Sequence, residues 1–276
     1  MAKPKFSIII PTLNEEKFLP KLLASITRQT VKNFDVVVVD GQSKDRTVAV
    51  ANSFKSRIPN LTIVSCDPAG VSRQRNMGAR VGRADWLVFV DADSILLPTF
   101  IERIGWFINR KHARFFTTWL MADRDDPVYA IAAFLFNISI EAEILIARPW
   151  APGPLTVVQR SAFELVGGYN ERCTYGEDHE LGVMIYKQGI PLRVLREVLY
   201  IYSFRRFRKE KTLKILDRTL KSTLAIMLTD RGLAHIPGFR SGGLMYGKTE
   251  QKKKKKTFPK DFERIVTKII DQFLSI

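Results

Sequence analysis

The sequence contains few of the residues on which disulfide-rich and zinc-binding proteins depend. Its 276 residues include two cysteines, Cys66 and Cys173, which lie far apart and outside C-x-x-C spacing. This pattern argues against a disulfide framework and against a cysteine-based zinc site. We expect two free thiols in a reducing compartment.

Long hydrophobic runs are also missing. No stretch has twenty uninterrupted apolar residues, and the nearest approach, residues 128–146, contains Asn137, Glu141 and Glu143. These polar side chains are costly in hydrocarbon, so the stretch does not predict a membrane-spanning helix. The first residues show no signal-peptide pattern. We therefore expect a cytoplasmic location.

Glycine-rich phosphate loops are absent as well. The dinucleotide fingerprint G-x-G-x-x-G does not follow the first apolar run, where the sequence reads PTLNEEKF, and no G-x-x-x-x-G-K-[ST] pattern occurs. These absences disfavour a dinucleotide cofactor and a P-loop NTPase.

Positive charge, in contrast, is abundant. The formal net charge is +16, and the stretches SFRRFRKEK and QKKKKK in the last third carry much of it. Such an excess attracts polyanions, including nucleic acid, anionic lipid and phosphorylated small molecules. With 46% hydrophobic residues, the chain can also bury a sizeable core.

Short apolar runs alternate with helical patterns over the first 95 residues. Strands are predicted at 6–10, 35–40, 61–66 and 86–91, with helices between them. This β-α alternation predicts an α/β fold with a Rossmann-like, mostly parallel central sheet flanked by helices. Ligands bind such sheets outside the carboxyl ends of the strands.

The remainder of the chain is predicted to complete one domain and then extend beyond it. Helices are expected at 98–110, 128–147 and 176–189, and strands at 114–122, 155–160 and 191–203. We assign residues 1–206 to one domain and 207–276 to a basic helical C-terminal extension. Its amphipathic stretch FERIVTKIIDQFL either lies on an anionic membrane or docks on the domain.

Four carboxylates mark the expected rim of the sheet. Glu15 follows the first strand, Asp40 ends the second, and Asp91 and Asp93 end the fourth. On a strand, residues two apart face the same side, so Asp91 and Asp93 are expected to address one point. Because like charges repel, a hard divalent cation such as Mg²⁺ fits between them.

Two groups of arginines are candidates for binding anions. Arg73 and Arg75 stand at the start of the helix in GVSRQRNMGAR, and guanidinium groups bind phosphates in a bidentate manner. Arg205 and Arg206 follow the last strand. They are candidates for contacting a diphosphate or an acidic acceptor, with a membrane surface and a solvated face as the other readings.

Six motifs in register resemble glycosyltransferase family 2. They are PTLNEE, DGQSKDRT, GVSRQRN, DADS, GGYNE and GED, within residues 5–206. The resemblance implies an inverting enzyme of the GT-A fold that uses a nucleotide-diphosphate sugar, such as a UDP- or GDP-sugar. It also implies a divalent cation, Mg²⁺ or Mn²⁺, and an acceptor that is a glycan or a lipid-linked molecule.

The resemblance also implies roles for individual residues. Asp93 and Asp91 are expected at the metal, and Asp178 is expected to be the general base, with Glu177 beside it. The residues expected to contact the nucleotide-sugar are Pro11, Thr12, Glu15, Asp40, Arg75 and Asp91. A carboxylate can take the proton of an acceptor hydroxyl, while a metal and an arginine oppose the charge that develops on the leaving diphosphate.

Two other readings stay open at this point. A sugar-phosphate nucleotidyltransferase could share the fold, although PTLNEE stands where its glycine-rich loop and lysine are expected. A basic nucleic-acid-binding protein would explain the lysine run. It would not explain the acidic strand ends, which repel phosphates, and no RRM, KH or zinc-finger pattern is present. We therefore expect no nucleic-acid partner.

Overall fold

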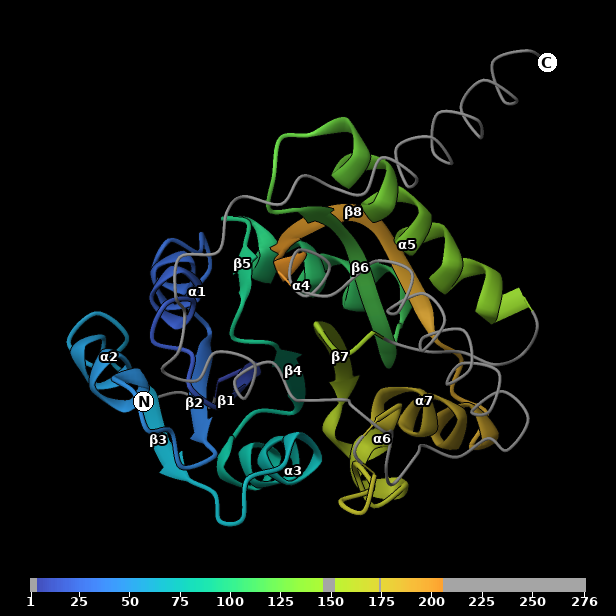
Figure 1. Ribbon diagram of the computed structural model, residues 1–276. Coiled ribbons are helices and arrows are strands. Elements are labelled where there is room, and N and C mark those ends of the chain that lie inside the picture. The colour runs from blue at the N-terminus through green and yellow to red at the C-terminus, as the bar shows by residue number, and fades with distance from the viewer. Residues whose placement is uncertain (1–3, 146–151, 174, 206–276) are drawn as a thin grey trace.

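The computed structural model describes residues 4–145, 152–173 and 175–205, and these form one eight-stranded sheet covered by helices on both faces (Figure 1). The expected C-terminal extension lies outside the described residues. The strands are β1 (Phe6–Thr12), β2 (Phe34–Asp40), β3 (Leu61–Ser65), β4 (Trp86–Val90), β5 (Ser94–Leu96), β6 (Phe115–Ala122), β7 (Leu155–Gln159) and β8 (Arg193–Tyr202). The helices are α1 (Leu19–Thr27), α2 (Thr47–Ser53), α3 (Val71–Val81), α4 (Phe100–Lys111), α5 (Pro127–Leu145), α6 (Arg160–Leu165) and α7 (Glu177–Lys187).

The first four strands confirm the expected parallel unit. In the sheet order β3-β2-β1-β4-β7-β6-β8-β5, β1 pairs in parallel with β2 and with β4, and β2 pairs in parallel with β3. The β1–β2 register runs from Phe6 opposite Phe34 to Thr12 opposite Asp40. The valines of β2 are buried on both faces, as a parallel strand covered by helices requires.

The second half of the sheet changes direction. Strand β7 runs antiparallel to β4 and to β6, whereas β6 and β8 are parallel. Pairing of Val90 with Leu155 carries the loop before β7 to the carboxyl end of β4. The short strand β5, antiparallel to β8, was not predicted, because three residues carry too little periodicity to be recognised.

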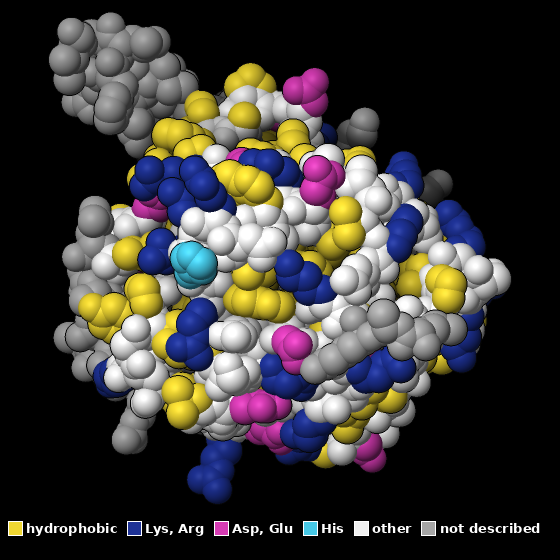
Figure 2. Space-filling view, turned by 180° about the vertical axis from the view of Figure 1, so that it is seen from behind, with side chains coloured by type: hydrophobic (Ala, Val, Ile, Leu, Met, Phe, Trp, Pro, Cys, Tyr) yellow, Lys and Arg dark blue, Asp and Glu magenta, His cyan; other side chains and the backbone are white. Residues whose placement is uncertain are grey.

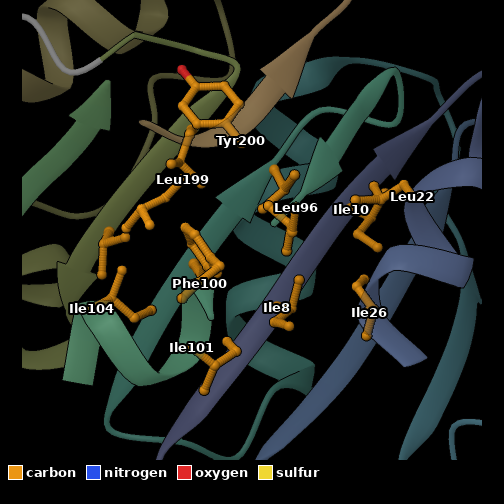
Figure 3. Close-up of a cluster of buried hydrophobic side chains, with 14 of the residues drawn as sticks. Ile8, Ile10, Leu22, Ile26, Leu96, Phe100, Ile101, Ile104, Leu199 and Tyr200 are labelled. Atoms are coloured by element: carbon orange, nitrogen blue, oxygen red, sulfur yellow. The ribbon is translucent and has the colours of Figure 1, made fainter. Parts of the chain in front are cut away.

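Hydrophobic clusters fill both faces of the sheet. Side chains alternate along a strand, so Ile8 and Ile10 of β1 enter one cluster and Ile9 enters the other. Figure 3 shows the larger cluster, in which Ile8 and Ile10 pack with Leu22 of α1 and Phe100 of α4. The opposite cluster is closed by α3, α6 and α7. These two layers hold the strand ends in place.

Candidate functional site

The site lies where the carboxyl ends of β1, β2 and β4 meet. Asp40 is held there by hydrogen bonds to both of its carboxylate oxygens. The Thr12 hydroxyl donates to Asp40 Oδ1 at 3.2 Å, and the Ser43 backbone N–H donates to Asp40 Oδ2 at 2.8 Å. Asp40 is only 4% exposed. The parallel register therefore places two of the predicted nucleotide contacts, Thr12 and Asp40, side by side. Pro11 precedes Thr12 in the same buried strand.

Helix α3 is fastened to these strand ends by Gln74. Its side-chain amide donates to the carbonyl oxygens of Thr12 at 2.8 Å and Val39 at 2.7 Å. The sequence analysis missed this residue, although it stands between the two arginines of the motif. Because Gln74 fixes the first turn of α3, the next side chain, Arg75, is directed inward.

Arg75 is the centre of the first of two clusters, which we call the Arg75 cluster. Its Nη2 donates to Asp91 Oδ1 and to the Gly153 carbonyl, both at 2.9 Å, and its Nη1 donates to Glu177 Oε1 at 2.9 Å. The guanidinium lies 5.2 Å from the Tyr169 ring centroid, and the Arg75 side chain is 2% exposed. Segments far apart in sequence are joined at one buried cation.

The acidic start of α7 completes the Arg75 cluster. Gly176 caps the helix with a φ of 77°, a left-handed conformation that glycine adopts without strain. Asp178 Oδ2 accepts from the Gly153 N–H at 2.8 Å. A Cβ atom at Gly153 would lie 3.3 Å from both Arg75 Nη2 and Asp178 Oδ2. A residue larger than glycine would therefore crowd these two side chains.

Burial changes the acidity of this cluster. Desolvation raises the pKa of Asp91, although the charge of Arg75 opposes the rise. Desolvation and the neighbouring Asp178 likewise raise the pKa of Glu177, against the influence of Arg75. One arginine thus keeps two carboxylates close in a setting that favours their neutral forms.

The second cluster, which we call the Arg205 cluster, forms at the exit of β8. The Arg205 guanidinium bonds both carboxylate oxygens of Glu15, at 2.7 and 2.6 Å, and its Nε lies 2.8 Å from Asp93 Oδ2. It also lies 4.3 Å from the centroid of Phe18. Burial raises the pKa of Asp93 to about 7, and Asp91 and Glu15 add to the rise while Arg205 opposes it.

The structure corrects the expected relation between Asp91 and Asp93. Strand β4 ends at Val90, and the chain turns through Asp91–Asp93 before β5 begins at Ser94, with the Ser94 N–H bonded to the Asp91 carbonyl at 3.0 Å. The two carboxylates therefore do not share a strand face. Asp91 bonds Arg75 and Asp93 bonds Arg205.

The two remaining predicted arginines are in neither cluster as far as the described residues show. Arg73 pairs with Glu171 at 3.1 Å, each about one-third exposed. Arg206 lies outside the described residues, as do residues 146–151. The predicted phosphate contact of Arg73 stays a prediction.

The residues at the turn fit a cation only if the substrate supplies part of its ligands. Among the residues that the structure describes, no three or more His, Cys, Asp or Glu side chains are grouped so that they could hold a metal ion. Carboxylate oxygens are the ligands that Mg²⁺ prefers, and it commonly takes one or two of them together with substrate phosphates and water. Asp93 and Asp91 match that pattern.

A third acidic group, Glu143 of α5, lies behind the Arg75 cluster and was not predicted as a site residue. Its Oε2 is 3.9 Å from Nδ1 of the buried His179. Burial, with a contribution from Asp178, raises the pKa of Glu143 to about 7. The signal that could have identified it is its place, with Glu141, near the end of a largely apolar stretch.

Comparison with known proteins gives a consistent result. The family model described as "Glycosyl transferase family 2" matches residues 7–164. A PGL/p-HBAD biosynthesis glycosyltransferase of Mycobacterium tuberculosis is 44% identical over 111 residues, which is 40% of this chain and 43% of the relative. An uncharacterized glycosyltransferase of Haemophilus influenzae is 40% identical over 98 residues, or 36% and 32% of the two chains. The chain thus covers less than half of the length of these relatives.

Solved structures extend the likeness of the fold. TarS 1–349 of Staphylococcus aureus in complex with UDP-GlcNAc has a TM-score of 0.61 and 23% identity, covering 72% of this chain and 58% of that chain. The mannosyltransferase PcManGT of Pyrobaculum calidifontis, in complex with GDP-Man and Mn²⁺, has a TM-score of 0.65 and 20% identity, covering 85% and 67%. At this identity the likeness establishes a shared fold, which agrees with the predicted GT-A architecture.

Proposed function

Because the chain belongs to glycosyl transferase family 2, we propose that it moves a sugar from a nucleotide-diphosphate donor to an acceptor by a single, inverting displacement. The observation that carries this proposal is Arg75, which joins Asp91 at the strand ends to Glu177 at the start of α7. One buried residue thus links the expected donor side of the site to the expected acceptor side. No observation in the described residues favours nucleotidyl transfer or nucleic-acid binding instead.

The donor is proposed to be a UDP- or GDP-sugar seated at the strand ends. Thr12 and Asp40 lie side by side at the end of β1 and β2, where open α/β sheets bind ligands. Relatives of this fold have been solved with UDP-GlcNAc and with GDP-Man. In this assignment Pro11, Thr12, Glu15 and Asp40 contact the nucleoside.

The acceptor oxygen is proposed to be activated by Asp178. The acceptor hydroxyl attacks the anomeric carbon and its proton passes to an Asp178 oxygen. As the new bond to that carbon forms, the bond from the carbon to the diphosphate oxygen breaks, and its electron pair leaves with the nucleotide. The Gly153 N–H orients Asp178, and Arg75 holds Glu177 aside. An acceptor that is already an anionic phosphate would need no such base.

A divalent cation, Mg²⁺ or Mn²⁺, is proposed to bind at Asp93 and Asp91 together with the diphosphate. When bound, it supplies positive charge against the leaving group. Arg205 already contacts Asp93, so it lies where it can reach the same diphosphate. The buried carboxylates Asp93 and Glu15 keep that guanidinium at the rim.

The test is calorimetric titration of UDP, GDP and dTDP into the chain, with and without Mn²⁺, followed by NMR of the anomeric proton of any transferred sugar. We expect cation-dependent binding of one nucleotide, its loss in Asp40→Asn and inversion in the product. Asp125→Asn, at an exposed position, is the matched control. Absence of nucleotide binding by a folded chain, or a product with retained configuration, contradicts the proposal.

A further inference from the structure

Helix α5 turns polar as well as apolar side chains toward the domain. Its Asn137 side chain points into the protein, where the amide donates to the Leu120 carbonyl at 2.9 Å and accepts from the Leu120 N–H at 3.0 Å on β6. Glu141 accepts from the Trp119 indole N–H at 3.1 Å. Polar residues of α5 therefore share the inward side with apolar ones, whereas surface helices usually place polar residues outward.

The outward side of α5 is apolar instead. Phe134, Leu135 and Ile138 are 56%, 48% and 41% exposed, and they follow one another at helical spacing. We call these three residues the α5 face. Other exposed hydrophobic residues, such as Trp106 and Leu165, stand singly on other elements. On the rear of the molecule hydrophobic and charged side chains are interspersed (Figure 2).

The helix is long and apolar, but it is held flat against the domain. Over Pro127–Ile144 its mean hydropathy is 1.4 and 22% of that window is buried, which by length and composition alone would allow it to cross a membrane. Tyr129 and Ala133 pack into one core cluster and Ile140 into the other. A helix that is packed along the domain through these residues can lie along a bilayer surface but not across the bilayer.

The most basic part of the chain begins beside this helix. The Phe204 ring packs edge-on against Tyr129 of α5, with centroids 6.1 Å apart, and the Phe204 N–H donates to Asp123. From Arg205 onward the sequence contains RRFRKEK and later five consecutive lysines. An apolar helix face and a polybasic segment that starts next to it are the two signals that stable binding to anionic membranes requires.

We propose that the α5 face binds a lipid bilayer with its apolar side chains at the headgroup boundary, and the positive charge of the sequence from Arg205 onward favours an anionic one. The membrane contact does not depend on the proposed function. A consequence does rest on it: α5 also carries Glu143, beside His179 and near Asp178. The bilayer would then lie on the α5 side of the candidate base, Asp178. The acceptor would be a lipid with a hydroxyl or phosphate head.

The test is flotation of the full chain with vesicles of phosphatidylcholine alone and of phosphatidylcholine with phosphatidylglycerol, at low and high salt. The variant is Phe134→Ser/Leu135→Ser/Ile138→Ser, and the control is Trp106→Ser/Leu165→Ser, which removes exposed apolar side chains elsewhere. We expect the α5 variant to lose about tenfold or more of the binding to anionic vesicles, because apolar burial and charge act together. The control should bind like the wild type.

Three results would overturn the proposal. The first is equal vesicle binding by the α5 variant and the control. The second is a wild-type dimer that the α5 variant converts to a monomer while vesicle binding is unchanged, which would assign the α5 face to a second copy. The third is unchanged vesicle binding with faster proteolysis of residues 206–276 in the variant, which would assign the face to the C-terminal segment.

Nucleotide binding separates this inference from the proposed function. The α5 variant should bind the nucleotide as the wild type does, since its three side chains are exposed and belong to neither the Arg75 cluster nor the Arg205 cluster. Vesicle binding without any nucleotide binding would contradict the proposed function and leave the membrane contact standing. Nucleotide binding with unaltered vesicle binding in the α5 variant would contradict the membrane contact and leave the proposed function standing.

Discussion

The Arg75 and Arg205 clusters use the same parts in two different settings. Each consists of one guanidinium between two carboxylates and close to an aromatic ring. Arg75 comes from α3, is 2% exposed and also bonds a backbone carbonyl. Arg205 follows β8 and is 11% exposed, and its partners Glu15 and Asp93 are 6% and 7% exposed, against 29% and 12% for Asp91 and Glu177. Arg75 cross-links α3, the turn after β4 and the start of α7, whereas Arg205 joins the exit of β8 to the strand ends at the rim of the sheet.

The comparison teaches that the segments each arginine connects, more than burial or chemical composition, divide the two roles. Removing one partner of a buried ion pair leaves an uncompensated charge in a low dielectric, and this cost grows as water is excluded. At the rim of the sheet, a bound substrate or ion can replace the charge of the partner that was removed. Stability and ligand dependence should therefore respond differently at the two arginines.

The largest effect is expected for Arg75→Met, which removes a fully buried cation and leaves the partly buried Asp91 and Glu177 without it. The free energy of unfolding should fall by about 3–5 kcal/mol, and transfer activity should be lost. Denaturant unfolding measures the first. The matched control is Arg73→Met in the same helix, whose exposed pair with Glu171 is expected to contribute about 0–1 kcal/mol. Equal losses in the two variants would break the comparison.

The next largest effect is expected for Asp178→Asn, which keeps the shape of the proposed base but removes its ability to take a proton. Transfer to a hydroxyl acceptor should fall about 10²–10⁴-fold, while nucleotide binding is retained. Steady-state rates and calorimetry report the two quantities separately. If Glu177→Gln alone shows the drop in rate, the base is assigned to the wrong carboxylate.

A smaller loss is expected for Arg205→Gln. Without the arginine, Glu15 and Asp93 remain mutually repulsive, and the free energy of unfolding should fall by about 1–3 kcal/mol. Mn²⁺ should raise the unfolding midpoint of this variant more than that of the wild type, because a cation that binds only the folded state stabilises it. An equal Mn²⁺-induced rise in the wild type and in Arg205→Gln would contradict a cation site at Asp93.

The smallest effect concerns Glu143, which faces His179 and Asp178 rather than an arginine. Its pKa is raised from 4.5 to about 7 in the folded state, so the folded state favours the protonated form. That contribution to stability is fully present below about pH 4.5 and is lost as the pH rises through about 7. Glu143→Gln should therefore gain about 1–3 kcal/mol relative to the wild type between pH 5 and pH 8. A pH-independent difference would show that the Glu143 carboxyl is not the titrating group.

The parallel half of the fold and its acidic rim were predictable, whereas the grouping of the rim residues was not. Buried valines in β2 and the isoleucines of β1 indicate strands by composition alone, and strand ends at one edge bring Thr12 and Asp40 together. The turn after Val90 gave Asp91 and Asp93 different arginine partners instead of one strand face, because the chain bends there before β5 begins at Ser94. A three-residue strand is decided by its partner, β8, which lies about a hundred residues away.

By itself, the sequence determined the family, the α/β layering and which residue types stand at the strand ends, because local hydrophobic periodicity and short motifs are encoded within a few neighbouring positions. Only the tertiary structure decided that Arg75 holds Asp91 with Glu177, that Arg205 holds Glu15 with Asp93, and that α5 turns Asn137 inward and Phe134 outward. These contacts join positions up to 190 residues apart. They depend on how the sheet, the helices and the excluded water are arranged in space, which no local pattern in the chain specifies.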